Sequence, residues 1–247
     1  MPDKIENECK LKKLTVEDYA IFKGKQEIEF STEDNKKITA IVGKMGTGKT
    51  LLYNAIKTCF SLEISGTKIS SNPIIDTTFD QRLISKENEW LFFVSEDTSQ
   101  KIMIQNYGEV ATYDIIKRMN EFYRVYDTKK DVDCFEVDKD HNIYAKNHNG
   151  LTVTLAASEQ TLANFTYILS VKKVCAGKSF LVIDGGLDRI TNEKKKNIMN
   201  MITENSVQVI WFCTDVEYNQ AEKDLVGKKY IIKYDSENKC SELEIFD

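Results

Sequence analysis

The alternation of apolar and polar residues predicts strands in the first part of the chain. In residues 11–30 the two kinds of position alternate around Lys23 and Gly24, which is typical of two strands joined by a turn. Residues 38–42 are apolar without alternation, as expected of a strand that is buried on both faces of a sheet. After a glycine-rich segment, residues 51–60 place apolar side chains on one helical face. The predicted order is therefore strand, glycine loop, helix.

The second half of the chain alternates between helical and strand patterns. Helical periodicity extends over 112–126, 158–175 and 193–202, whereas 179–184 and 207–213 are predicted to be buried strands. Strands that alternate with helices favour an α/β sheet. Weaker signals predict strands at 90–94 and 101–106, a hairpin at 132–148 with its turn near 138–142, and turn-rich structure at 65–82.

Composition agrees with a folded protein that stays inside the cell. A hydrophobic content of 41% and only two prolines exclude a disordered or collagen-like chain, and a net charge of -5 excludes a wholly basic nucleic-acid coat. No apolar run approaches the roughly 18 to 20 residues of a membrane span, and the polar start lacks a secretion signal. The six cysteines form no CxxC pair, so free thiols are expected. We therefore expect a cytoplasmic protein without membrane association.

One segment carries a phosphate-binding motif. Residues 43–50 read GKMGTGKT and match G-x-x-x-x-G-K-[ST] at every fixed position, between a predicted strand and a predicted helix. Backbone N–H groups of such a loop and the start of its helix bind phosphates, Lys49 reaches the β- and γ-phosphates, and the Thr50 hydroxyl binds Mg²⁺. The alternative is a glycine turn that only caps a helix. The predicted ATP-binding residues are Gly43, Lys44, Met45, Gly46, Thr47, Gly48, Lys49, Thr50 and Leu51.

An acid at the end of a buried strand supplies the second half of a magnesium site. Residues 180–183 are apolar and are followed by Asp184, the arrangement that holds Mg²⁺ in P-loop enzymes. The alternative is an acid that serves only as a strand cap. Lys49 and Asp184 are therefore the first candidates for catalysis, and Thr50 and Asp184 for metal binding.

A third motif resembles the signature of ABC-type ATPases. Residues 155–171, LAASEQTLANFTYILSV, are similar to the LSGGE-type signature and its helix. The resemblance implies that Ala157, Ser158 and Glu159 would cap, in trans, the ATP held by the P-loop of another subunit. The match is degenerate, because Ala156, Ala157 and Ser158 replace Ser, Gly and Gly. The alternative is a plain helix for which Ser158 is the N-cap.

Together the three motifs resemble an ATPase head of the SMC, RecF and DNA-repair branch of ABC-type ATPases. The opening residues 11–30 resemble this branch more than transporter ATPases, and residues 181–191 and 208–220 are similar to motifs of DndD-like defence ATPases. The resemblance implies an α/β P-loop NTPase fold with a mixed sheet, flanking helices and an antiparallel β subdomain. It also implies one domain over 1–247, with an N-lobe at about 1–110, a helical and signature region at about 111–175 and a C-lobe at about 176–247.

The departures from this family concern hydrolysis. Most ABC heads carry, after the metal-binding Asp, a Glu that polarises the attacking water, and Gly185 occupies that position here. Thr214 and Asp215 take the place of the usual switch histidine. We therefore expect weak ATP hydrolysis, assisted by Asp188, Asp215 or Glu217, or by a partner subunit. For the glutamine of the Q-loop, Gln81 is a weak candidate.

The interval between the motifs is short for an SMC-like chain. Most such chains carry hundreds of residues of coiled coil there, but no heptad run separates Lys49 from Ser158. We expect that this head lacks the coil, or that residues 113–126 are its stump. Lysines that are candidates for contact with DNA phosphates are Lys10, Lys12, Lys13, Lys36 and Lys37.

The leading hypothesis is an ATP-dependent dimerising ATPase with Mg²⁺, which acts as a switch in DNA repair, maintenance or antiviral defence. Its expected partners are an identical or different ATPase head and a nuclease or other effector, with DNA contact through the complex left open. One alternative is a P-loop nucleotide kinase, which is disfavoured because the chain has only four arginines for a lid. Another alternative is a non-hydrolysing ATP-binding subunit, which is suggested by Gly185 at the position of the usual catalytic Glu. A transporter ATPase is the least favoured alternative.

Overall fold

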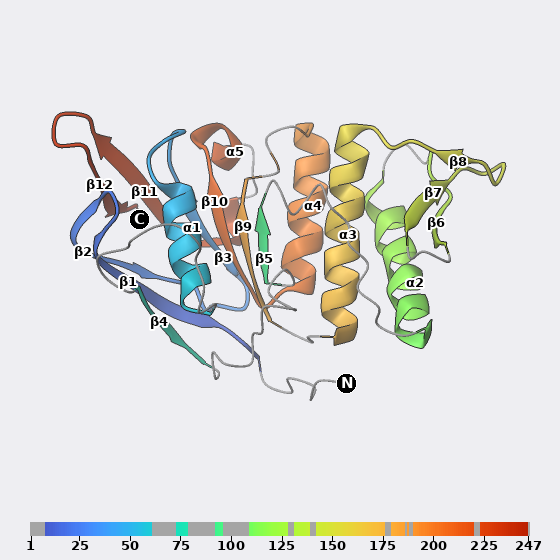
Figure 1. Ribbon diagram of the computed structural model, residues 1–247, viewed down its shortest axis with the longest axis horizontal. Coiled ribbons are helices and arrows are strands. Elements are labelled where there is room, and N and C mark those ends of the chain that lie inside the picture. The colour runs from blue at the N-terminus through green and yellow to red at the C-terminus, as the bar shows by residue number, and fades with distance from the viewer. Residues whose placement is uncertain are drawn as a thin grey trace.

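A large mixed sheet with helices on its faces forms the body of the molecule in the computed structural model (Figure 1). The structure describes residues 8–60, 73–78, 92–95, 109–127, 131–138, 142–175, 179–185, 187, 190–219 and 223–246. The strands are β1 (Leu11–Tyr19), β2 (Phe22–Glu29), β3 (Ile38–Val42), β4 (Ile74–Thr77), β5 (Phe93–Ser95), β6 (Cys134–Val137), β7 (Ile143–Lys146), β8 (Thr152–Val153), β9 (Phe180–Asp184), β10 (Gln208–Cys213), β11 (Val226–Asp235) and β12 (Cys240–Ile245). The helices are α1 (Lys49–Thr58), α2 (Glu109–Tyr126), α3 (Ala157–Cys175), α4 (Asn192–Asn205) and α5 (Asp215–Asn219), with a 3-10 turn at Lys223–Leu225.

The sheet confirms the predicted α/β class. Its nine strands follow the order β4-β1-β2-β12-β11-β3-β10-β9-β5, and β3, β10, β9 and β5 run parallel to one another. All residues of β3 and β10 are buried, which explains why these segments are apolar without alternation. Because parallel strands end at the same edge, the loops after β3, β9 and β10 meet there.

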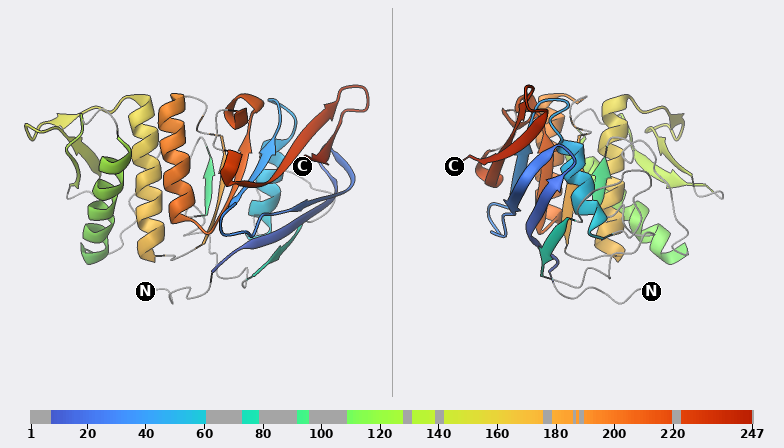
Figure 2. Two further views of the ribbon diagram at one scale, coloured as in Figure 1. Left: turned by 180° about the vertical axis from the view of Figure 1, so that it is seen from behind. Right: turned by 60° about the vertical axis from the view of Figure 1, so that its left-hand side comes forward.

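Helices extend the molecule beyond the sheet. α1 packs against β9 and β10, while α4, α3 and α2 lie side by side in a row (Figures 1 and 2). The antiparallel strands β6, β7 and β8 form a separate small sheet next to α2, at the far end of the molecule from β11 and β12. This small sheet corresponds to the antiparallel β subdomain that the sequence predicts.

The first hairpin turns earlier than predicted. β1 ends at Tyr19 and β2 begins at Phe22, so the turn does not fall at Lys23 and Gly24. Asp18 and Ala20 both take positive φ values, which produces the tight turn and a bulge in the register. Gly24 lies within β2, where its N–H donates to Asp18 Oδ1 at 2.8 Å.

Four strands were not predicted from the pattern. β4 lies within the segment 65–82 that was predicted to be turn-rich, and β8, β11 and β12 had no predicted counterpart. β6 and β7 confirm the hairpin at 132–148, and the Asp138 N–H donates to the Asn142 carbonyl oxygen across its end. β5 confirms a strand near 90–94, while the strand predicted at 101–106 lies outside the described residues.

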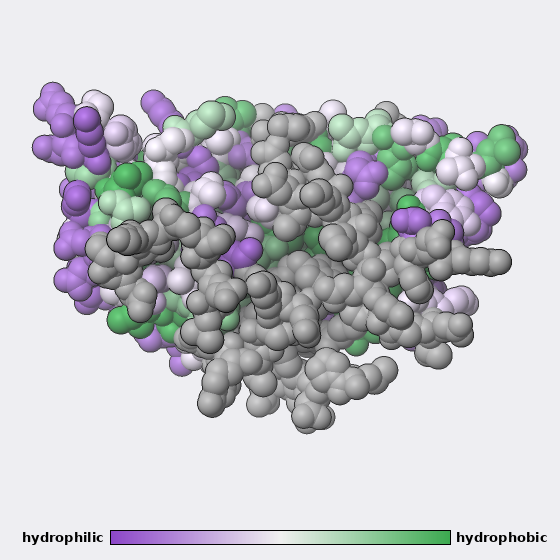
Figure 3. Space-filling model, in the orientation of Figure 1, coloured by the Kyte–Doolittle hydropathy of each residue, from purple (hydrophilic) through white to green (hydrophobic). Residues whose placement is uncertain are grey.

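The surface is hydrophilic at the tip of the β11–β12 hairpin (Figure 3). None of the helices in the described ranges is both long and apolar enough to cross a membrane.

Candidate functional site

The loop between β3 and α1 depends on its glycines. Gly46 and Gly48 take φ values of 82° and 100°, which side-chain-bearing residues rarely adopt. A Cβ on Gly48 would also lie 2.9 Å from Cζ of Phe22, so the β1–β2 hairpin presses directly on this turn. Gly43 is equally confined, because a Cβ there would lie 2.5 Å from Thr47 Oγ1. The glycine positions of the motif are therefore required by the shape of the loop.

Lys49 folds across this loop. Its Nζ donates to the carbonyl oxygens of Gly43 at 2.7 Å and Lys44 at 2.9 Å. The Thr47 hydroxyl also donates to the Lys44 carbonyl, at 2.9 Å. Gly48 is the N-cap of α1 and provides no side chain to accept from the first-turn N–H groups. The loop thus combines an ammonium group with uncapped N–H groups, a donor set that suits an anionic phosphate.

Asp184 lies close to the helix that follows this loop. It ends β9, directly beside Phe212 of β10 and Ser95 of β5. Burial raises the pKa of the Tyr53 hydroxyl on α1, and the Asp184 carboxylate raises it further. Because α1 packs against β9, Asp184 lies at the end of a strand that contacts this helix.

The predicted ligands Thr50 and Asp184 carry hard oxygen atoms, the ligand type that Mg²⁺ prefers. Among the described residues, no three His, Cys, Asp or Glu side chains cluster as a metal site. Mg²⁺ commonly needs only one or two carboxylates, because phosphate oxygens and water complete its shell. Thr50, exposed in the first turn of α1, and Asp184 are the residues that would hold it.

The signature helix α3 is capped by Ala156 and not by Ser158. The Ala156 carbonyl oxygen accepts from the N–H groups of Glu159 and Gln160, each at 2.9 Å. In return the Ala156 N–H donates to Glu159 Oε2 at 2.8 Å. The N-cap alternative for Ser158 is therefore wrong, because Ser158 is the second residue of the helix. Its Oγ is 3.4 Å from Nζ of Lys194 on α4.

The position of the usual catalytic Glu has an unusual backbone. Gly185 takes a φ of 70° directly after β9, a left-handed conformation that favours glycine over glutamate. Its N–H lies 3.4 Å from the Phe212 carbonyl oxygen. Asp188, the nearest acid proposed to compensate, lies outside the described residues, as does Gln81.

The end of β10 lies beside the loop and carries the switch position. The Gly43 N–H donates to the Cys213 carbonyl oxygen at 3.0 Å. Burial raises the pKa of the Cys213 thiol, the Glu217 carboxylate raises it further, and the Lys49 ammonium lowers it. Asp215, which begins α5, is exposed, whereas Glu217 is buried, hydrogen-bonded to Thr214 through Oε2, and has an Oε1 without a partner among the described residues. Of these two acids, Asp215 is the one exposed to solvent.

The motifs meet on one edge of the molecule. α1, α3, α4 and α5 all begin at the upper edge in Figure 1. α3 and α1 are separated there by α4, β9 and β10, a separation that both Figures 1 and 2 show. The start of α3, which carries the predicted signature, therefore lies on the same edge as the P-loop but apart from it.

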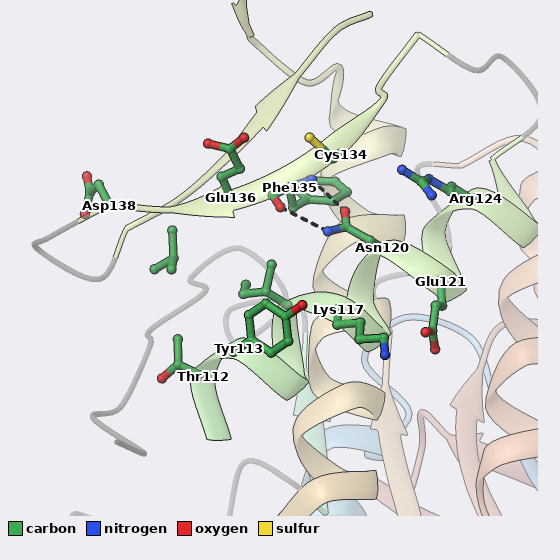
Figure 4. Close-up of a pocket in the computed structure, with 12 residues that line it drawn as sticks. Thr112, Tyr113, Lys117, Asn120, Glu121, Arg124, Cys134, Phe135, Glu136 and Asp138 are labelled. Carbon is green, nitrogen blue, oxygen red and sulfur yellow. Dashed lines mark hydrogen bonds between the residues drawn. The ribbon is translucent and has the colours of Figure 1, made fainter. Parts of the chain in front are cut away.

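A second concave region lies between α2 and β6 (Figure 4). This groove has a volume of about 980 Å³. Asn120 of α2 accepts from the Phe135 N–H at 2.6 Å and donates to the Phe135 carbonyl oxygen at 3.0 Å. Arg124 donates to the Asp133 carbonyl oxygen. These polar side chains attach the small sheet to α2.

Comparisons with known proteins bear on the family and the fold. A family model described as "AAA domain" matches residues 13–243. Similar solved structures are an SMC head domain from Thermotoga maritima (14% identity, 96% of this chain and 99% of that chain covered, TM-score 0.59) and an SmcHead bound to the C-winged helix domain of ScpA (14%, 96% and 97%, 0.68). A third is a Smc head domain with an extended coiled coil, bound to the C-terminal domain of ScpA derived from Pyrococcus furiosus (10%, 97% and 96%, 0.68). Curated protein sequences give no match. At these identities the structural likeness establishes the fold, which is that of an SMC head.

Proposed function

The chain belongs to the AAA domain family, and from this premise we propose that it is an ATP-dependent dimerising ATPase head. Two copies would close on two ATP molecules, each held by the P-loop of one copy and the signature of the other. The observation that carries this proposal is that the P-loop and the start of α3 lie on the same edge of the molecule but are separated along it (Figure 1). Each chain then offers half of two sites, and a second copy completes both.

The P-loop would bind the nucleotide in cis. The N–H groups of residues 43–51 would surround the phosphates, and Lys49 would exchange its two carbonyl partners for phosphate oxygens. Thr50 and Asp184 would hold Mg²⁺, which neutralises phosphate charge when bound. The fit rests on the ammonium, the uncapped α1 terminus and the nearby acid.

The signature would bind the same nucleotide in trans. Ala156 and Ala157 are exposed and small, so the start of α3 can be approached closely, and Ser158 adds a hydroxyl. Glu159 is buried and engaged with the Ala156 N–H, which makes it a helix-capping residue in this proposal. In this proposal, Ala157 and Ser158 are therefore the residues that would contact the ATP held by the other copy.

Hydrolysis would be slow. The left-handed Gly185 removes the usual general base, a group worth about 10²- to 10⁴-fold in rate. Asp215 is the exposed acid next to the P-loop and is our candidate for partial compensation. ATP would thus act as a long-lived clamp that sets the shape of the assembly. A non-hydrolysing subunit is the second candidate, which the same glycine favours.

The proposed setting is a cytoplasmic complex for DNA repair, maintenance or antiviral defence. Its support is the resemblance of the motifs to SMC, RecF and DndD-like ATPases, and two of the similar SMC heads are bound to domains of a partner, ScpA. By analogy we propose that this head acts on a nuclease or other effector protein, with DNA reached through that complex.

The proposal is tested by light scattering and turnover measurements on the purified chain. ATP with Mg²⁺ should double the mass of the wild type, and Lys49→Ala should remain a monomer. ATP turnover that is lost in Asp184→Asn would exclude the non-hydrolysing alternative. An unchanged mass with ATP demonstrably bound would refute dimerisation.

A further inference from the structure

Lys194 is a buried lysine at the proposed dimer edge. It lies in the first turn of α4, its exposed fraction is 4%, and its Nζ is 3.4 Å from Ser158 Oγ. Lysines are almost never buried without a partner, because removing the ammonium from water is unfavourable. By contrast, Lys196, two positions further along α4, is exposed. The burial of Lys194 therefore has to be explained, whereas an exposed lysine on the surface needs no explanation.

The chemistry of the pair fixes the direction of their hydrogen bond. An ammonium group has only donors, whereas a serine hydroxyl both donates and accepts. Ser158 must therefore accept from Lys194, which leaves its own proton free to donate to another oxygen. The 3.4 Å separation is longer than an ordinary hydrogen bond, so both groups retain freedom to turn towards a third atom.

We propose that Lys194 is a positioning residue for ATP bound in trans. It orients the Ser158 hydroxyl towards the γ-phosphate held by the P-loop of a second copy. This inference rests on the proposed function and deepens it.

The test measures two quantities separately: the ATP concentration that gives half-maximal dimerisation, and the affinity of the monomer for ATP. In Lys194→Met, which keeps the length of the side chain, the ATP concentration for half-maximal dimerisation should rise about tenfold or more, because a charge-assisted contact is lost at both sites of the dimer. ATP affinity of the dilute monomer should stay within about twofold of the wild type, because the P-loop is intact. Lys194→Arg should restore most of the dimerisation.

Three control variants make the result specific. Lys196→Met on the exposed face of α4, and Lys172→Met, a buried lysine at the far end of α3, should dimerise like the wild type. Ser158→Ala should weaken dimerisation, and adding Lys194→Met to it should have little further effect, since Lys194 acts through that hydroxyl.

Several outcomes would overturn the inference. Wild-type dimerisation in Lys194→Met would refute it while leaving the proposed function standing. Loss of dimerisation in both Lys194→Met and Lys194→Arg, with lowered melting temperatures, would show a purely structural role, as would additive effects in the Ser158 double variant. A wild type that binds ATP without dimerising would refute the proposed function itself.

Discussion

Glu217 accepts two hydrogen bonds from Thr214 through a single carboxylate oxygen, from the N–H at 2.8 Å and from the hydroxyl at 3.0 Å. The Glu217 N–H donates back to Thr214 Oγ1 at 3.3 Å. This reciprocal pair is a capping box, and it fixes the start of α5 beside the P-loop. An acid that looks catalytic from its place after β10 therefore has a structural role.

Glu217→Ala should lower the free energy of unfolding by about 1–2 kcal/mol, because the Thr214 N–H and hydroxyl lose their acceptor. Asp215→Ala should change stability by less than about 0.5 kcal/mol, because Asp215 is exposed, yet it should reduce ATP turnover. Urea unfolding and a phosphate-release assay measure the two effects. Unaltered stability in Glu217→Ala would contradict the capping role.

Lys49→Met should abolish the rise in melting temperature that ATP with Mg²⁺ gives to the wild type. The melting temperature without nucleotide should change little, because the described partners of Nζ are only two loop carbonyl groups near the surface. Lys23→Met, on the exposed face of β2, is the matched control and should keep the full ATP response. A normal rise in melting temperature with ATP in Lys49→Met would show that the P-loop lysine is not needed to bind ATP.

Gln208 joins the β1–β2 hairpin to the parallel core, and its loss should be strongly destabilising. Its amide accepts from the Leu11 N–H at 2.8 Å and donates to the carbonyl oxygens of Leu11 and Ser31, each at 2.7 Å. Gln208→Leu leaves three buried main-chain groups without this partner, so unfolding free energy should fall by about 3 kcal/mol or more. Denaturant unfolding checks this value, and a loss below about 1 kcal/mol would show that the hairpin is held by other contacts.

The buried Lys172 should make stability depend on pH. Burial lowers its pKa from 10.5 to about 7 in the folded protein, where Nζ donates to the Phe180 carbonyl oxygen at 2.6 Å. Between these two values the unfolded chain binds more protons, so raising the pH stabilises the fold by up to about 1.4 kcal/mol per unit. Below about pH 7 both states are protonated and the full penalty of burying the charge remains.

Lys172→Met removes this titration and isolates it from other groups. The variant should gain stability over the wild type at about pH 6, and this advantage should shrink steadily towards about pH 9. Thermal or urea unfolding at the two pH values measures the difference. An advantage that is equal at both would show that Lys172 does not titrate in this range.

Local patterns predicted the strand, loop and helix around residues 43–50, because the motif specifies its own local structure. Long-range features were not accessible in this way. The contact between Lys194 and Ser158 depends on how α4 packs against α3, and no periodicity reports it. Similarly, serine is a residue type that often forms an N-cap. In the structure, however, Glu159 accepts from the Ala156 N–H, and Ala156 takes the N-cap position in place of Ser158.

The missed strands differ in the physical reason why they were missed. β11 and β12 are rich in charged residues, and their pairing is supported by contacts such as the ion pair between Lys233 and Glu244 at 2.6 Å, which become visible only once the register is known. β4 is a short strand at the end of the sheet order, where half-buried alternation is weak. The early turn of the first hairpin was missed because Gly24 gave a stronger turn signal than Asp18 and Ala20.

The most direct test of the central claim is crosslinking between two differently tagged chains, one carrying Met45→Cys and the other Ala157→Cys. Met45 is 94% exposed in the P-loop and Ala157 is exposed at the start of α3, so neither change should disturb the fold. With a short thiol crosslinker, the account predicts a linked pair of the two tags that forms only with ATP and Mg²⁺ and is absent for wild-type chains or with Lys49→Ala added to the Met45→Cys chain. Crosslinking that ignores ATP, or that joins two Met45→Cys chains as efficiently as the mixed pair, would contradict a dimer in which each signature faces the P-loop of its partner.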